Sequence, residues 1–184
     1  MIRTHRQSVS VIAFVLLITA LAVGQALLQE KAEAQRAAAK GYALAATEGE
    51  HRIRNGGNLY VKVDPTKGSD NLALGTQQVP AKAGIPIHQH AKMDEVFYVL
   101  EGSGFFVLND ERIPVEKGSV AFIPKGSWHG FENPNGELLL LWAVSPPGLE
   151  GFFREVATPP GVPPRVLTRD ELRAIARKYD MEFR

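Results

Sequence analysis

Two patterns of apolar residues divide the chain, and each predicts a different kind of structure. Residues 9–23 form an uncharged, mostly apolar run, whereas residues 49–144 hold short runs of Val, Leu, Phe and Ile separated by Gly, Pro and Asn-Asp. Short runs at this spacing are typical of an all-β sandwich or barrel. We expect strands at residues 59–63, 72–79, 96–100, 105–108, 112–115, 120–123, 128–131 and 137–144. Pro114 indicates an edge strand or a bulge.

A different pattern follows the predicted strands. Residues 159–164 (PPGVPP) predict a stiff, extended connector. Thr168 and Glu171 have the spacing of a capping box, and an apolar stripe continues to Tyr179. We therefore expect one short C-terminal α-helix that packs on the barrel.

The N-terminal run has the layout of a secretory signal. Basic residues precede it, and the small residues around Ala22 and Ala26 provide two candidate cleavage sites. The low-polarity stretch can also be extended over residues 9–28, which is long enough for an uncleaved membrane anchor. Either reading predicts an exported protein, periplasmic, secreted or tethered to a membrane. An Ala-rich segment with Glu, Lys, Gln and Arg follows and favours a helical stalk.

These patterns predict four parts. They are a signal peptide or anchor at 1–26, a stalk or linker at 27–48, a β-barrel domain at 49–155, and a connector with a helix at 156–184.

Composition excludes several classes of function. The 184 residues carry a formal net charge of +1, which argues against a nucleic-acid partner that would be bound through its phosphates. There is no cysteine, so disulfides, thiolate metal sites and thiol nucleophiles are excluded. A bound metal would therefore be held by nitrogen and oxygen atoms.

Three of the five histidines form two compact clusters, which are the main chemical signal of the sequence. Side chains two residues apart on a strand share a face, so His88 and His90 can bind one ion, and Glu95 follows shortly after. His129 would arrive from a distant strand. Three imidazoles and a carboxylate suit Fe, Mn, Ni, Co or Zn, and octahedral geometry would leave two positions open.

Residues 84–133 resemble the two motifs of the cupin superfamily. The first motif, HxHxxxxExxxxxxG, runs from His88 to Gly102, and the second, GxxxxxPxGxxHxxxN, runs from Gly118 to Asn133. One departure is that three residues separate Gly84 from His88, where the family more often has five.

The resemblance implies a cupin β-barrel, or jelly roll, with one divalent metal ion. It implies that the ligands are His88, His90, Glu95 and His129. Asp94 is the local rival for the carboxylate, but the six-residue gap to Gly102 fits Glu95. The resemblance also favours a homodimer.

The function remains open among three hypotheses. The chain is similar to quercetin-dioxygenase-like single-domain cupins, which implies a dioxygenase acting on a small organic substrate with adjacent oxygen atoms, with Glu95 as general base. The alternatives are a metal-dependent isomerase or decarboxylase, which would want Arg or Lys in the pocket, and a non-catalytic binding module. Strand parity places Phe97, Val99 and Phe131 in the expected substrate pocket.

Overall fold

The computed structural model describes residues 18–19, 21–31, 40–134 and 136–184. The chain divides into two compact units, Met1–Gly41 and Tyr42–Arg184. In the first unit, residues 18–19 and 21–31 are helical. The predicted secretory segment falls largely on residues 1–17 and 20, outside the described residues. None of the helices within the described ranges has the length and apolar character needed to cross a bilayer.

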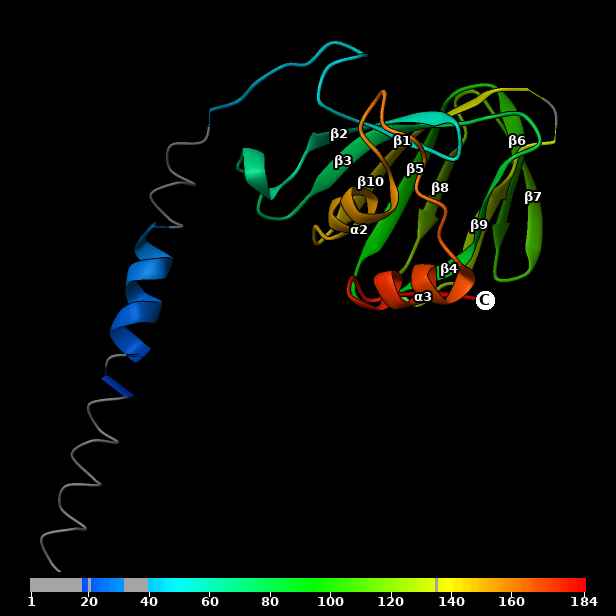
Figure 1. Ribbon diagram of the computed structural model, residues 1–184. Helices are drawn as coiled ribbons and strands as arrows, with labels where there is room; N and C mark the ends of the chain where they lie inside the picture. The colour runs from blue at the N-terminus through cyan, green and yellow to red at the C-terminus, as the bar shows by residue number, and fades with distance from the viewer. Residues whose placement is uncertain (1–17, 20, 32–39, 135) are drawn as a thin grey trace, which may run out of the picture. The chain divides into compact units, whose positions relative to one another are not determined.

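The second unit is built from two antiparallel β-sheets (Figure 1). The first sheet has six strands in the order β1-β2-β3-β10-β5-β8. These strands are β1 (Glu50–Arg54), β2 (Gly57–Val63), β3 (Ala73–Val79), β10 (Leu138–Ser145), β5 (Asp94–Glu101) and β8 (Val120–Ile123).

The second sheet has five strands in the order β11-β4-β9-β6-β7. These strands are β11 (Met181–Phe183), β4 (Gly84–His90), β9 (His129–Glu132), β6 (Ser103–Leu108) and β7 (Glu111–Glu116). Strand β7 lies at the edge of this sheet, as Pro114 predicts, because proline cannot donate a ladder hydrogen bond.

The core lies between the inner faces of the two sheets. In β10 alternate residues are fully buried, and Trp142 is one of them, in ring contact with Phe153 at 5.2 Å. Gly75 of the neighbouring strand makes room for this indole, because a Cβ there would lie 2.5 Å from its ring. Trp142 is therefore a core residue and does not lie on the outer face.

The expectation of an all-β unit with one short helix needs correction, because the fold is mostly β with two helices in its C-terminal part. Helix α2 (Leu149–Val156) follows β10, and α3 (Arg169–Arg177) begins with the predicted capping box at Thr168. Thr168 Oγ1 accepts from the Glu171 backbone N–H at 3.2 Å, and the Glu171 carboxylate accepts from the Thr168 N–H at 2.8 Å. Sequence analysis did not predict α2, because the helix has only eight residues and its apolar side chains do not repeat often enough to give a helical pattern.

The predicted stalk also ends earlier than expected. Residues 40–45 form no helix. Instead the Lys62 ammonium on β2 donates to the carbonyl oxygens of Ala45, Ala46 and Glu48 at 2.7–3.0 Å. These contacts join residues 45–48 to the sheet and satisfy backbone groups that a helix would have bonded internally.

Candidate metal centre

Four side chains that could bind a metal meet in the interior of the second unit. His88 and His90 lie on β4, Glu95 on β5 and His129 on β9, and each is at most 4% exposed. One potential ligand atom from each residue lies within 4.8 Å of the others. The structure therefore brings the four predicted residues into one buried cluster, typical of a cupin metal site.

Local backbone contacts position these residues. Strands β4 and β9 pair so that His88 lies opposite His129. The turn before β9 is joined to the same strand, because the Gly126 N–H donates to the His90 carbonyl at 2.7 Å. Gly126 has a φ of +81°, a conformation that glycine adopts at little cost. The second motif thus holds its histidine against the first.

Backbone carbonyls orient two of the imidazole rings. His88 Nδ1 lies 2.8 Å from the Pro86 carbonyl oxygen, and His129 Nδ1 lies 2.9 Å from that of Ser127. A carbonyl oxygen can only accept, so each Nδ1 donates its proton, and Nε2 is left as the ring atom that faces the cluster. Partners of this kind orient the histidine ligands of metal ions.

The Glu95 carboxylate lies between the other two histidines. Its Oε2 is 3.0 Å from His90 Nε2 and 2.9 Å from His129 Nε2. Two ring nitrogens and one carboxylate oxygen therefore converge within about 3 Å of one another's partner atom. Two ligand bonds of about 2.1 Å at a right angle would separate the donor atoms by about 3.0 Å. The donor set and its spacing therefore fit a divalent ion.

Two buried atoms of the cluster lack a partner among the described residues. They are Glu95 Oε1 and His90 Nδ1. Buried polar atoms are normally paired, so two unpaired atoms in one cluster are a further sign that the site is built for a ligand.

The pKa values of His88 and Glu95 favour the protonation states that bind a cation. Burial, with the neighbouring His129 and His90, lowers the pKa of His88 to about 3, so this ring is neutral at pH 7. Burial alone would raise the pKa of Glu95, but contacts with His129 and His90 outweigh it and lower the pKa to about 2. An anionic carboxylate beside a neutral imidazole is the protonation state that metal binding requires.

The neighbouring carboxylate of Asp94 has a different role. Its Oδ1 accepts from the Lys125 backbone N–H at 2.9 Å, and the residue is exposed. Strand alternation turns Asp94 away from the interior that Glu95 faces. Among the two candidate carboxylates, only that of Glu95 is in the cluster.

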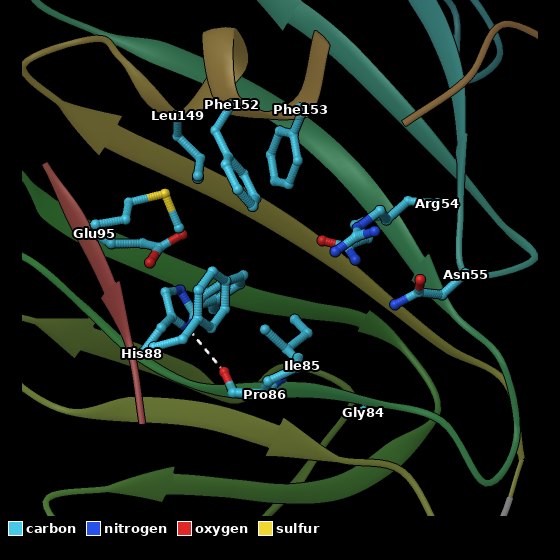
Figure 2. Close-up of a pocket in the computed structure, with 14 residues that line it drawn as sticks. Arg54, Asn55, Gly84, Ile85, Pro86, His88, Glu95, Leu149, Phe152 and Phe153 are labelled. Carbon is cyan, nitrogen blue, oxygen red and sulfur yellow. Dashed lines mark hydrogen bonds between the residues drawn. The ribbon is translucent and has the colours of Figure 1, made fainter. Parts of the chain in front are cut away.

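A cavity of about 40 Å³ reaches the cluster at His88 and Glu95 (Figure 2). This volume has room for about three water molecules. Of the three residues expected in a substrate pocket, Phe97 lines this cavity, whereas Val99 and Phe131 do not. Both are core residues, and Phe131 packs on Phe97 with ring centroids 5.0 Å apart. They share the inward face, but they lie farther along their strands than the cavity extends.

Most of the cavity wall comes from segments that sequence analysis did not assign to the site. Helix α2 contributes apolar side chains above the cavity (Figure 2). Strand β11 contributes two more. Arg54, Asn55 and Gln77 supply polar groups. The additional lining residues from α2 and β11 are Leu149, Phe152, Phe153, Met181 and Phe183. Only the inward parity of Gln77 on a predicted strand could have indicated any of them.

An ion-pair network holds α2 in place. Arg154 on α2 pairs with Glu50 on β1 at 2.6 Å and with Asp64, which follows β2. Glu155 instead accepts from Lys178 and Tyr179, both at 2.7 Å. Arg154 thus connects the helix above the cavity to the hairpin that carries Arg54.

Comparison with known proteins identifies the family. The family model described as a cupin domain matches residues 75–144. An uncharacterized protein of Methanocaldococcus jannaschii is 34% identical over 84 residues, which cover 42% of this chain and 67% of that protein. The chain belongs to the cupin superfamily.

Named relatives differ in activity. The oxalate-binding protein of Thermotoga maritima is 31% identical over 67 residues, covering 36% of this chain and 55% of that protein. The acireductone dioxygenase of Heterostelium pallidum is 37% identical over 73 residues, covering 35% of this chain and 50% of that protein. The chain therefore spans between half and two thirds of the length of these three relatives.

A solved structure supports the same fold. The polyketide cyclase RemF from Streptomyces resistomycificus matches with a TM-score of 0.53 and 25% identity, over 72% of this chain and 91% of that chain. These relatives share a fold and differ in reaction, so they establish the family of this chain without choosing its chemistry. None of the relatives named above is a quercetin dioxygenase, so the expected similarity to that group is not shown.

Proposed function

We propose that this chain is a mononuclear metal-dependent oxidoreductase of the dioxygenase type, acting on a small organic substrate with two adjacent oxygen atoms. The observation that carries the proposal is the unpaired Glu95 Oε1 in a buried cluster that opens into a cavity through His88 and Glu95. Three imidazoles and one carboxylate would hold the ion and leave room for further ligands. A bound ion would polarise the substrate oxygens and hold them in position.

Glu95 is assigned first to the ion. With a pKa lowered to about 2, its carboxylate is fully ionised at neutral pH but is a weak base. It would accept a proton only from a substrate hydroxyl that is itself made acidic on binding. Oε1, which has no partner among the described residues, is the atom at which that proton would arrive.

The cavity wall supports a small substrate. Leu149, Phe152 and Phe153 of α2 cover one side of the cavity and restrict the entry of water. Pockets for drug-sized molecules have volumes of about 300–1,000 Å³, far above the volume of about 40 Å³ here. The cavity therefore favours a substrate of a few heavy atoms over a polycyclic aromatic compound.

A second candidate is a metal-dependent decarboxylase or isomerase acting on a small organic acid. The observation that favours it is Arg54, a cation in the cavity wall. The name of the oxalate-binding relative points in the same direction. A non-catalytic module that captures such an acid would use the same residues.

Metal content and oxygen uptake of the full chain would test the proposal. Elemental analysis should find near-stoichiometric Fe, Mn, Ni or Co in the protein and a large loss in Glu95→Gln. The matched control is Asp94→Asn, which removes a neighbouring carboxylate outside the cluster and should keep its metal. Equal occupancy in Glu95→Gln and in the control would contradict the role of Glu95.

Loaded protein would then be screened for oxygen consumption with small α-hydroxyketones, diketones and hydroxy acids. Oxygen consumption with one of these compounds supports the dioxygenase. Release of CO₂ or isomerisation without oxygen uptake would overturn it in favour of the second candidate. Binding without turnover would leave a capture module.

We also propose that the protein is exported, on the strength of the apolar run that follows the basic N-terminus. The N-terminal residue of the mature protein would test it. Val23 or Leu27 at the N-terminus is the expected result of cleavage, whereas Met1 in a membrane fraction would support the anchor. Met1 in a soluble cytoplasmic fraction would contradict export.

A further inference from the structure

Arg54 lies on the opposite side of the cavity from the metal-binding cluster. It is the last residue of β1, and the turn that follows begins with Asn55. Figure 2 shows Arg54 and Asn55 on one side of the pocket, with Glu95 and His88 on the other. A ligand held at the cluster would therefore extend toward the guanidinium.

The guanidinium of Arg54 has no acidic partner among the described residues. Its one hydrogen bond there is from Nη1 to the Val156 carbonyl oxygen, at 3.5 Å. By contrast, Arg52 pairs with Glu50 at 2.8 Å, and Arg112 pairs with Glu132 at 2.7 Å. Since a guanidinium has five N–H donors, most of those on Arg54 remain available to a ligand.

Leaving this cation without a carboxylate partner is costly. Burial lowers the pKa of Arg54, which reflects the loss of hydration of its charge. Arginine nevertheless stays protonated in proteins, so the cavity wall carries a positive charge. A partly buried charge without a counter-ion calls for a partner that the protein itself does not supply.

Two amide side chains, those of Asn55 and Gln77, line the same cavity. Asn55 follows Arg54 and Gln77 lies on β3, and neither side chain hydrogen-bonds to another described residue. Gln77 is only 9% exposed. Apart from the one bond of Arg54 to Val156, these three polar side chains have no hydrogen-bond partner among the described residues, and the cavity that they line is otherwise mostly apolar. Donors of this kind match the oxygens of a carboxylate, which arginine binds through two parallel hydrogen bonds.

We infer that Arg54, supported by Gln77 and Asn55, binds a carboxylate group of the ligand, so that this cavity takes a small organic acid whose other oxygens face His88 and Glu95. The inference rests on the proposed function, because it assigns the substrate class of the same site. The inference holds whether the protein oxidises the acid, decarboxylates it or only binds it.

A structural role for Arg54 is the alternative to be tested. Its contact with Val156 places a cation at the C-terminal end of α2, where it interacts favourably with the helix dipole. Loss of that contact would change stability and not ligand selectivity. The experiment must therefore compare ligands with and without a second carboxylate.

The test is calorimetric titration of the metal-loaded full chain, under anaerobic conditions, with oxalate, malonate and succinate. These dianions place their two carboxylates at increasing separation, so the best binder reports the span between the ion and Arg54. Acetohydroxamate serves as a chelator without a carboxylate. Arg54→Met is the test variant, Arg54→Lys retains the charge, and Arg52→Met is the matched control.

Arg54→Met should weaken binding of the best dicarboxylate by about 10- to 100-fold, the range for hydrogen bonds between charged groups. Arg54→Lys should lose less, and Arg52→Met should bind as the unmodified protein does. Acetohydroxamate affinity should change by less than about twofold. Metal content should be unaltered in all three variants.

Equal dicarboxylate affinity in Arg54→Met and the unmodified protein would overturn the inference, and so would an equal loss for acetohydroxamate. If Arg54→Met does not fold, Arg54→Lys and Gln77→Leu carry the same comparison. If the protein holds no metal, the proposed function fails on its own, and titration of the metal-free chain still decides whether Arg54 binds these acids. Absence of turnover has no bearing on this result.

Discussion

The replacement Arg154→Met tests the ion-pair network that connects α2 to β1. Asp64 is fully buried, and its carboxylate accepts from Arg154 and from the Thr66 hydroxyl, the latter at 2.7 Å. Burial alone would raise the pKa of Asp64, but the bonds from Arg154 and Thr66 outweigh burial and lower it. Removing the guanidinium leaves an anion buried with one hydroxyl partner.

The expected loss of stability follows from this geometry. Breaking a buried pair by removing one partner costs about 3–5 kcal/mol. Arg154 keeps 29% of its side chain exposed, and Thr66 remains, so we expect the free energy of unfolding to fall by about 2–4 kcal/mol. Arg52→Met is the control, because Arg52 contacts Glu50 but not Asp64, and should cost less than about 1 kcal/mol.

Urea unfolding followed by tryptophan fluorescence would measure these values, since Trp142 is buried next to Phe153 on α2. The double variant Arg154→Met with Asp64→Asn should recover part of the loss, because it removes the unpaired charge.

The pH dependence gives an independent check. The folded pKa of Asp64 is lowered below its unfolded value of about 4, so the stability from the network is present above about pH 4 and is lost as the pH falls through the folded pKa. The deficit of Arg154→Met should therefore be largest near neutral pH and should shrink in acid. A deficit no larger than that of Arg52→Met, or one that does not vary with pH, would refute the reasoning.

Two further predictions concern the site and the barrel. His129→Ala should abolish stoichiometric metal while circular dichroism still shows a folded β protein, and full metal retention would contradict the ligand assignment. Gly102→Ala should destabilise the barrel by about 2–3 kcal/mol, because its φ is +85° and a Cβ would lie 2.2 Å from the Glu137 carbonyl oxygen. The control Gly118→Ala has a similar φ of +92° but no atom within 4 Å of the Cβ, so it should cost only about 1 kcal/mol, and equal losses in urea would contradict the contact argument.

Local patterns were sufficient for most of the strands and for the cluster. Short apolar runs separated by Gly, Pro and Asn-Asp predicted most of the strands, because β-strands in such a fold are short and end in turns. The motif spacing placed His88, His90, Glu95 and His129 together, and the turn glycines of the same motifs have the positive φ values that the turns need. The strands and the four ligands could be predicted because they depend on residue spacing within each motif and on strand parity.

The cavity wall could not be predicted in this way. Helix α2 and strand β11 are short, and neither has a distinctive pattern of its own. Met181 reaches the cavity because β11 pairs with β4, a contact between segments about 90 residues apart. Val99 and Phe131 have the correct parity but lie in the core, because parity specifies a face of the sheet and not a distance along the strand.

The sequence by itself determined the cupin motifs, the four candidate ligands and the exclusion of thiolate chemistry, because these depend on residue type and spacing alone. Only the tertiary structure decided what surrounds the ligands. It placed Arg54 and Gln77 in the cavity wall and linked Arg154 of α2 to Glu50 and Asp64. The physical reason is that ion pairs and cavity walls depend on the packing of distant segments, which neither periodicity nor spacing encodes.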